Sequence, residues 1–306
     1  MFLTGPRAAP AAGPALRRAA FHRDDTDSPL AAHPTLRPYL TDLAATHGLA
    51  LRKEVLGTGQ AYAELAAPAV EAVTAPDEPV DLLVLAYGVP DVQPGRNVAP
   101  HLASRCPGDP LAFAICDQGP AAAFTALRLI VDYAATGACT RAVLVVAEQA
   151  ALPYPLAAPA PVPDGHAAVA LLFEPGPAPV EVRTHPGLPP ESVGAVLAAE
   201  LAGVDPDATL VLGPGLDGLP GMPATGVRRS DPGLPHTGTW AHLADGEPGR
   251  PTVLADYEPA LGYLCVATSG TPMSTPDTWS TAEGGGEDAH RREALNGTFV
   301  GNTSLT

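Results

Sequence analysis

Positive charge is scarce in this sequence. Of its 306 residues only 17 are Lys or Arg, against 33 Asp or Glu, which gives a formal net charge of −16. Lys53 is the single lysine. A surface with this balance repels phosphate groups, so the sequence predicts no binding to nucleic acid or to an anionic membrane surface.

Cysteine is also scarce. The four cysteines are too few and too scattered for a disulfide framework, and none forms a CxxC pair: Cys106, Cys116, Cys139 and Cys265. The histidines show no ligand spacing, so we expect no metal site. Each cysteine is therefore either a small buried side chain or a reactive thiol.

Long apolar runs are missing. No uninterrupted run approaches the roughly 18–20 residues that a transmembrane helix needs. Near the N-terminus Pro6, Pro10 and Pro14 interrupt any signal-peptide core. The sequence thus predicts a cytoplasmic protein.

Apolar strands and helices alternate through the middle of the chain. Hydrophobic residues make up 46% of the sequence. We expect helices over 61–73, 120–136, 191–202 and 237–244, and strands over 80–87, 111–115, 141–147, 167–173, 209–213, 251–255 and 261–267. Because most of these strands are almost continuously apolar, the sequence predicts α/β sheets that are covered on both faces.

Two pairs of segments resemble each other across the chain. Residues 80–90 are similar to 207–215, and 141–147 are similar to 251–256, in the same order. This pattern indicates two fused copies of one α/β unit. We expect an Ala/Pro/Arg-rich arm and leading segment over 1–50, a first half over 51–178, an abbreviated second half over 179–270 and a disordered tail over 271–306. The first forty residues should be loosely ordered.

One glycine pattern is typical of a dinucleotide-binding site, but the residues that follow it do not form the helix that such a site needs. Residues 213–218 match GxGxxG after a predicted strand. The following Leu-Pro-Gly-Met-Pro cannot open a helix, so no dinucleotide or other cofactor is predicted.

Cys116 is the leading candidate for a nucleophile. It follows the predicted strand 111–115 and precedes the helix that opens at Pro120. A helix start carries partial positive charge and free N–H groups, which favour a thiolate and can hold the oxyanion of an attacked thioester. Asp117 opposes this effect, because a neighbouring carboxylate disfavours a second negative charge. Alternatively, Cys116 is a buried residue that ends a strand.

The segment Leu-Ala-Phe-Ala-Ile-Cys-Asp-Gln-Gly-Pro-Ala-Ala-Ala-Phe-Thr-Ala-Leu, residues 111–127, resembles the nucleophile region of the thiolase superfamily, particularly ketoacyl synthase III-like enzymes. A strand that ends in Glu148 follows, then Asp164-Gly-His-Ala leading into another strand, as in that family. The resemblance covers about residues 57–173. It implies a thiolase-like duplicated five-layer α/β/α/β/α sandwich, which agrees with the repeat.

The second half departs from the family pattern. Where the family places a catalytic His, at the end of the strand over 209–212, this chain has Gly213-Pro214-Gly215. Where the family has a catalytic Asn, the chain has His236. Pseudo-twofold packing would bring His236 to Cys116, where it could act as the base for acyl transfer. His242 is the second candidate, and a plain loop residue is the alternative for His236.

These observations leave two functions open. The first is a ketoacyl synthase III-like acyltransferase that moves an acyl group from a CoA or carrier-protein thioester through Cys116, with His236 as base, in a polyketide or other specialised-metabolite pathway. By resemblance, condensation relies on the family's His and Asn as donors that stabilise an enolate. Condensation is therefore disfavoured, because losing one such donor typically lowers the rate by about 100–1,000-fold. The second is a catalytically silent partner subunit of an active ketosynthase. By resemblance, either protein forms a homodimer or a heterodimer with a ketosynthase-like subunit.

Overall fold

Two five-stranded sheets carry the fold. The computed structural model describes residues 12–93, 95–155, 160–245 and 250–270. The first sheet has the strand order β1-β5-β4-β2-β3, and its members are β1 (Pro14–Arg23), β2 (Leu82–Ala86), β3 (Leu111–Ile115), β4 (Ala142–Glu148) and β5 (Ala167–Pro175). The second has the order β6-β10-β9-β7-β8, with β6 (Glu181–His185), β7 (Thr209–Leu212), β8 (Val227–Arg229), β9 (Thr252–Glu258) and β10 (Tyr263–Ser269).

The two sheets repeat one topology. In the first sheet, β5 pairs antiparallel with β1 and β4, whereas β2 pairs parallel with β4 and β3. In the second sheet, β10 pairs antiparallel with β6 and β9, whereas β7 pairs parallel with β9 and β8. Strand β4 therefore corresponds to β9, and β2 corresponds to β7. These are the segments that the sequence comparison paired, so the predicted duplication is confirmed.

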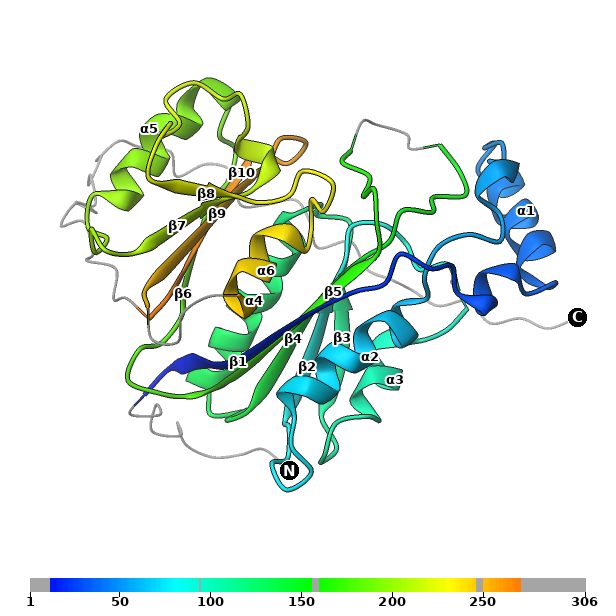
Figure 1. Cartoon of the computed structure of the whole chain (residues 1–306), viewed down its shortest axis with the longest axis horizontal. Helices are drawn as coiled ribbons and strands as arrows, with labels where there is room; N and C mark the ends of the chain where they lie inside the picture. Colours follow the sequence, from blue (N-terminus) through cyan, green and yellow to red (C-terminus); the bar gives the residue numbers. More distant parts are fainter. Residues whose placement is uncertain (1–11, 94, 156–159, 246–249, 271–306) are drawn as a thin grey trace, which may run out of the picture. The chain divides into compact units, whose positions relative to one another are not determined.

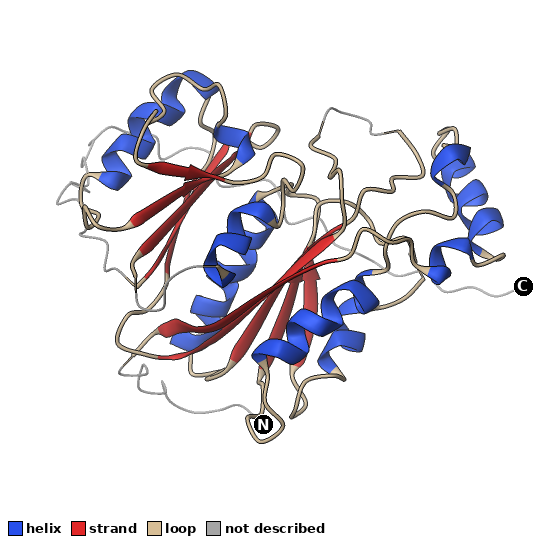
Figure 2. Cartoon of the chain, in the orientation of Figure 1, coloured by secondary structure: helices blue, strands red, loops and turns tan. Residues whose placement is uncertain are grey.

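The helices form three further layers (Figures 1 and 2). Helices α2 and α3 cover one face of the first sheet, α4 and α6 lie between the sheets, and α5 covers the outer face of the second sheet. Their bounds are α1 (Leu36–Thr46), α2 (Tyr62–Val73), α3 (Val98–Ala103), α4 (Ala121–Ala135), α5 (Pro190–Leu201) and α6 (Gly238–Ala244), with short 3₁₀ turns η1 (Pro29–Ala32), η2 (Lys53–Val55) and η3 (Pro214–Leu216). The predicted five-layer fold class is thus confirmed.

Alternation along the strands explains why their sequences are apolar throughout. In β2, Leu83 and Leu85 pack in the core with α2, whereas Leu82 and Val84 pack in the core with α4. Successive side chains of a strand point to opposite faces, so a sheet between two helix layers needs apolar residues at every position. No helix among the described residues is long and apolar enough to cross a membrane.

The first sheet also takes a strand from a segment where we predicted a loose arm. Residues 14–23 form β1, which pairs with β5 along nearly its whole length. Its outer positions are polar or part-exposed because β1 is an edge strand, and this weakened the apolar pattern. Strands β6 and β8 and helices α1 and α3 were likewise not predicted. The tail over 271–306 lies outside the described residues.

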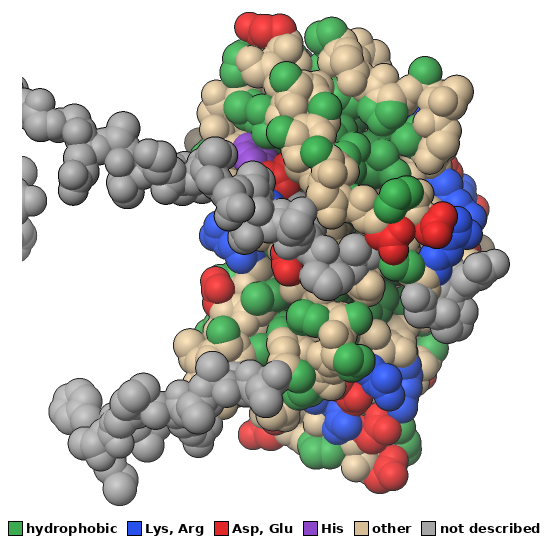
Figure 3. All heavy atoms as spheres, turned by 90° about the vertical axis from the view of Figure 1, so that its left-hand side faces the viewer, with side chains coloured by type: hydrophobic (Ala, Val, Ile, Leu, Met, Phe, Trp, Pro, Cys, Tyr) green, Lys and Arg blue, Asp and Glu red, His purple; other side chains and the backbone are tan. Residues whose placement is uncertain are grey.

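Most arginines of the described chain lie beside carboxylates. Ion pairs join Arg18 to Glu78 and Arg141 to Glu174, and seven other arginines pair in the same way: Arg17, Arg23, Arg52, Arg96, Arg105, Arg183 and Arg229. On the face shown in Figure 3, basic and acidic side chains accordingly adjoin each other.

Candidate functional site

Cys116 lies where the sequence predicted, in the turn between β3 and α4. The next residue, Asp117, has a φ of 61°, a left-handed conformation that Asp tolerates better than most side chains do. This backbone turn sets the carboxylate beside the thiol, and Cys116 Sγ donates to Asp117 Oδ2 at 3.3 Å. The hydroxyl group of Tyr87, the residue that follows β2, also interacts with the sulfur.

The surroundings of Cys116 keep its thiol protonated. Partial burial raises the pKa of Cys116, and the hydrogen bond to Asp117 and the charge of that carboxylate raise it further. The Tyr87 hydroxyl acts in the opposite direction. Because the thiolate is the nucleophilic form, this thiol is a weaker nucleophile than an unperturbed cysteine at neutral pH.

His236 is buried between β8 and α6, with 4% of its surface exposed. Its ring packs so closely on Gly88 that a β-carbon there would collide with the imidazole. Burial lowers the pKa of His236 to about 4, although the nearby Pro161 backbone opposes this shift. Neither ring nitrogen makes a hydrogen bond within the described residues, so Cys116 and His236 are not hydrogen-bonded to each other.

His242, the second candidate base, lies on α6 itself. Burial also lowers its pKa, and the charge of Arg228 lowers it further. No hydrogen bond within the described chain joins either histidine to Cys116.

Glu148 joins the two halves at the start of α6. The carboxylate ends β4, is fully buried and accepts hydrogen bonds from the backbone N–H groups of His236 at 2.9 Å and Thr237 at 2.8 Å. The Thr237 hydroxyl also donates to it. Burial raises the pKa of Glu148 to about 7, while these three donors favour its ionised form. Glu148 therefore positions the backbone of His236.

Glu258 is the counterpart of Glu148 in the second half. Strands β4 and β9 have seven residues each. The first residue of β4 pairs with the first residue of β2, and the first residue of β9 pairs with the first residue of β7. Glu148 and Glu258 are therefore the equivalent last residues of the two strands. The Glu258 carboxylate packs against Gly119, where a β-carbon would collide with it. Burial raises the pKa of Glu258.

The start of α4 cannot bind Glu258 as the start of α6 binds Glu148. Pro120 immediately precedes α4, as Thr237 immediately precedes α6. Pro120 therefore occupies the position from which Thr237 donates its backbone N–H group to Glu148. Proline has no N–H group, and Glu258 instead accepts the backbone N–H of Ala260 at 2.9 Å. Glu258 was not predicted as a site residue, although extending the match between 141–147 and 251–256 pairs it with Glu148.

A third carboxyl group, that of Asp256, lies beside Gly213 at the end of β7. Asp256 packs against Gly213 so closely that no larger residue fits there. Its Oδ1 accepts N–H groups from Gly215 at 3.0 Å and Tyr257 at 2.8 Å, while its buried Oδ2 has no partner within the described residues. Burial raises the pKa of Asp256 to about 7, and the charge of Glu258 contributes.

Within the described residues, no three His, Cys, Asp or Glu side chains form a group that could hold a metal ion. The centre of the fold is therefore a set of buried carboxyl groups and one neutral imidazole, with the Cys116 thiol hydrogen-bonded to Asp117.

Solved structures resemble this chain in fold. AbyA1, a tetronic acid condensing enzyme, matches with a TM-score of 0.52 at 17% identity, covering 84% of this chain and 100% of that one. The 3-oxoacyl-[acyl-carrier-protein] synthase III of Aquifex aeolicus VF5 matches with a TM-score of 0.53 at 14% identity, again covering 84% and 100%. No protein-family model and no curated protein matches the chain. At these identities the likeness establishes the fold.

Proposed function

The chain has the thiolase-like fold of ketoacyl synthase III-like enzymes, and on that premise we propose that it is a catalytically silent subunit that pairs with an active ketosynthase. One observation carries the proposal: the buried Glu258 carboxyl group packs against Gly119, just before α4, and the buried Asp256 carboxyl group packs against Gly213. Acyl transfer develops negative charge on an oxyanion, which buried carboxylates repel. The proposal also places the protein in the cytoplasm, where CoA and carrier-protein thioesters are made.

Proton transfer between Cys116 and His236 is also unfavourable. The pKa of the Cys116 thiol is raised, whereas that of His236 falls to about 4, so the imidazole is a poor acceptor for the thiol proton. Enolate stabilisation lacks a donor as well, because Gly213 stands at the position of the family histidine.

A second candidate function is acyl transfer through Cys116 from a CoA or carrier-protein thioester, with His236 as base, in a polyketide or other specialised-metabolite pathway. The Tyr87 hydroxyl beside the sulfur favours it, since a hydrogen-bond donor stabilises a thiolate. This function requires the His236 ring to reach the sulfur.

Intact-protein mass spectrometry separates the two functions. The native chain is incubated with a panel of acyl-CoAs and acyl-carrier proteins, beside Cys116→Ala and His236→Ala. We expect no acyl adduct on the native chain, because the thiol stays protonated. An adduct that disappears in Cys116→Ala would overturn the silent-subunit proposal and establish the second candidate. Loss of rate in His236→Ala would then identify the base.

Strand β3 supports pairing with another subunit. It is an edge strand whose five residues are all apolar, and Leu111 leaves 53% of its surface exposed. An exposed apolar edge strand is a template for pairing with another chain. The equivalent edge strand, β8, instead carries Arg228 and Arg229, as edge strands that face water commonly do.

We predict that Ala114→Lys, on the exposed edge strand β3, abolishes pairing. A charge buried between two edge strands costs several kcal/mol, which weakens association by about a hundredfold or more. Light scattering gives the mass of the chain alone and mixed with a candidate ketosynthase. Arg228→Glu, at an exposed position of the edge strand β8, is the control and should leave the mass unchanged. A native chain that stays monomeric in both samples, or an Ala114→Lys variant that still pairs, would contradict the proposal.

A further inference from the structure

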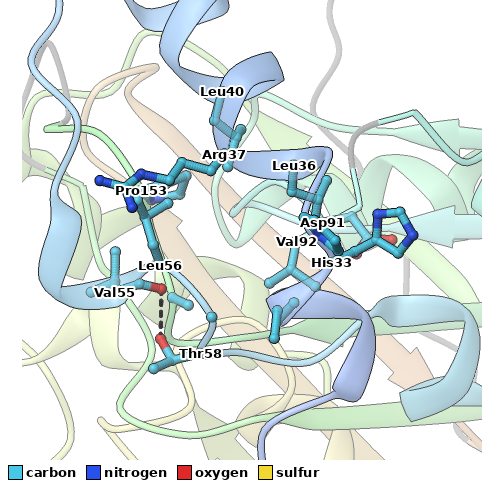
Figure 4. A pocket seen from close by; sticks show the side chains of 15 residues that line it. His33, Leu36, Arg37, Leu40, Val55, Leu56, Thr58, Asp91, Val92 and Pro153 are labelled. Carbon is cyan, nitrogen blue, oxygen red and sulfur yellow. Dashed lines mark hydrogen bonds between the residues drawn. The ribbon is translucent and has the colours of Figure 1, made fainter.

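A cavity of about 310 Å³ lies beneath α1, and Cys116 is not among its lining residues. Figure 4 shows its walls, which come from α1, from the segment around η2 and from the loop after β2. Most lining side chains are apolar, including Leu36, Leu40, Val55, Leu56, Val92 and Pro153. Cavities of this size with apolar walls and a few polar groups are the usual binding sites of small molecules.

Arg37 is the positive group of this cavity. Its side chain extends from α1 along the cavity on the side of Pro153 (Figure 4). Unlike the nine paired arginines described above, Arg37 makes no ion pair with any described residue. Arg128 and Arg228 also make no ion pair with a described residue, but of these three arginines only Arg37 lines the cavity. Its planar fork of donors matches a carboxylate.

The other polar groups of the wall are already occupied or turned away from solvent. His33 Nδ1 lies 2.7 Å from Thr35 Oγ1, and the Thr58 hydroxyl donates to the Val55 carbonyl at 2.8 Å. Asp91 Oδ1 accepts the backbone N–H of Gln93 at 3.0 Å, and its Oδ2 is buried. Burial raises the pKa of Asp91 to about 6, so this carboxyl group is still mostly ionised at neutral pH, and a bound carboxylate must lie on the Arg37 side of the cavity (Figure 4).

We propose that the cavity beneath α1 binds a small molecule with an apolar body and one carboxylate, which Arg37 holds. The apolar walls bury the body, and the unpaired guanidinium at the cavity binds the carboxylate through two parallel hydrogen bonds. Neither the β3 edge nor the Cys116 thiol takes part, so this inference is independent of the proposed function.

Octanoate is a suitable probe, and calorimetric titration of the full chain measures its binding. We expect octanoate to bind, while octanol and acetate, which lack the carboxylate and the apolar body respectively, bind at least tenfold more weakly. Arg37→Gln should weaken octanoate binding by about tenfold, the effect of losing a charged hydrogen-bond pair. Arg105→Gln, which removes an exposed arginine paired with Glu71, is the matched control and should bind octanoate as the native chain does.

Ala32→Phe tests the position of the ligand. Ala32 lines the cavity and is exposed, so a larger side chain can enter the cavity without displacing the core. This variant should fold normally and lose octanoate binding. The proposal would be overturned if the native chain did not bind octanoate. It would also be overturned if Arg37→Gln and Ala32→Phe bound octanoate as tightly as the native chain does.

Discussion

Replacing Glu148 with alanine is expected to lower the free energy of unfolding by about 4 kcal/mol. The carboxylate is fully buried and accepts two backbone N–H groups and one hydroxyl at the start of α6. Each buried donor left without a partner costs about 1–3 kcal/mol. Urea denaturation measures the loss, and the emission of Trp240 should shift to the red because this buried α6 residue loses its fixed position.

Two further variants test whether the hydrogen bonds cause this loss. Glu148→Gln keeps one acceptor oxygen and should lose less stability than Glu148→Ala. Glu78→Ala removes a surface glutamate paired with Arg18, and it should lower the stability much less than Glu148→Ala does, because solvent screens an exposed ion pair. Equal stabilities of Glu148→Ala and the native chain would show that Glu148 does not hold α6.

The pH dependence of stability is expected to change most in Asp256→Asn. The pKa of Asp256 is about 7 in the folded chain, above the ordinary 3.8, so folding favours the protonated form. Below about pH 4 the Asp256 carboxyl group does not change the free energy of unfolding. As the pH rises from about 4 to about 7, this group lowers the free energy of unfolding progressively. This difference corresponds to about 4 kcal/mol. Asp256→Asn removes the charge and should be more stable than the native chain at pH 8, with little difference at pH 4.

Urea denaturation at a series of pH values checks this prediction. Between about pH 4 and 7 the raised pKa values of Asp256, Glu148 and Asp91 lower the stability of the native chain, whereas the lowered pKa of His236 raises it. Asp256→Asn should flatten the profile, whereas Asp42→Asn, on the exposed side of α1, should leave it parallel to that of the native chain. An Asp256→Asn profile that runs parallel to that of the native chain would contradict the raised pKa of Asp256.

The sequence by itself determined the repeated strand and helix pattern of the core. The apolar run that became β4 and the long helix that became α4 lie within one or two residues of their predicted bounds. Burial on both faces forces apolar residues into consecutive positions, and such runs are visible without knowledge of their partners. The edge strand β1 was not visible, because its polar outer positions are explained only by its pairing with β5.

The sequence also located Cys116 and His236 at turns before two central helices. The effect of Asp117 on Cys116 was predicted from the sequence, but only the tertiary structure decided the burial that is the main cause of both pKa shifts. Glu148 holds the His236 backbone from 88 residues away, and burial between the two sheets keeps the imidazole neutral. Glu258 also meets a residue distant in the chain, because its carboxyl group packs against Gly119. Local pattern fixes secondary structure, whereas charge and burial depend on which surfaces meet when the chain folds.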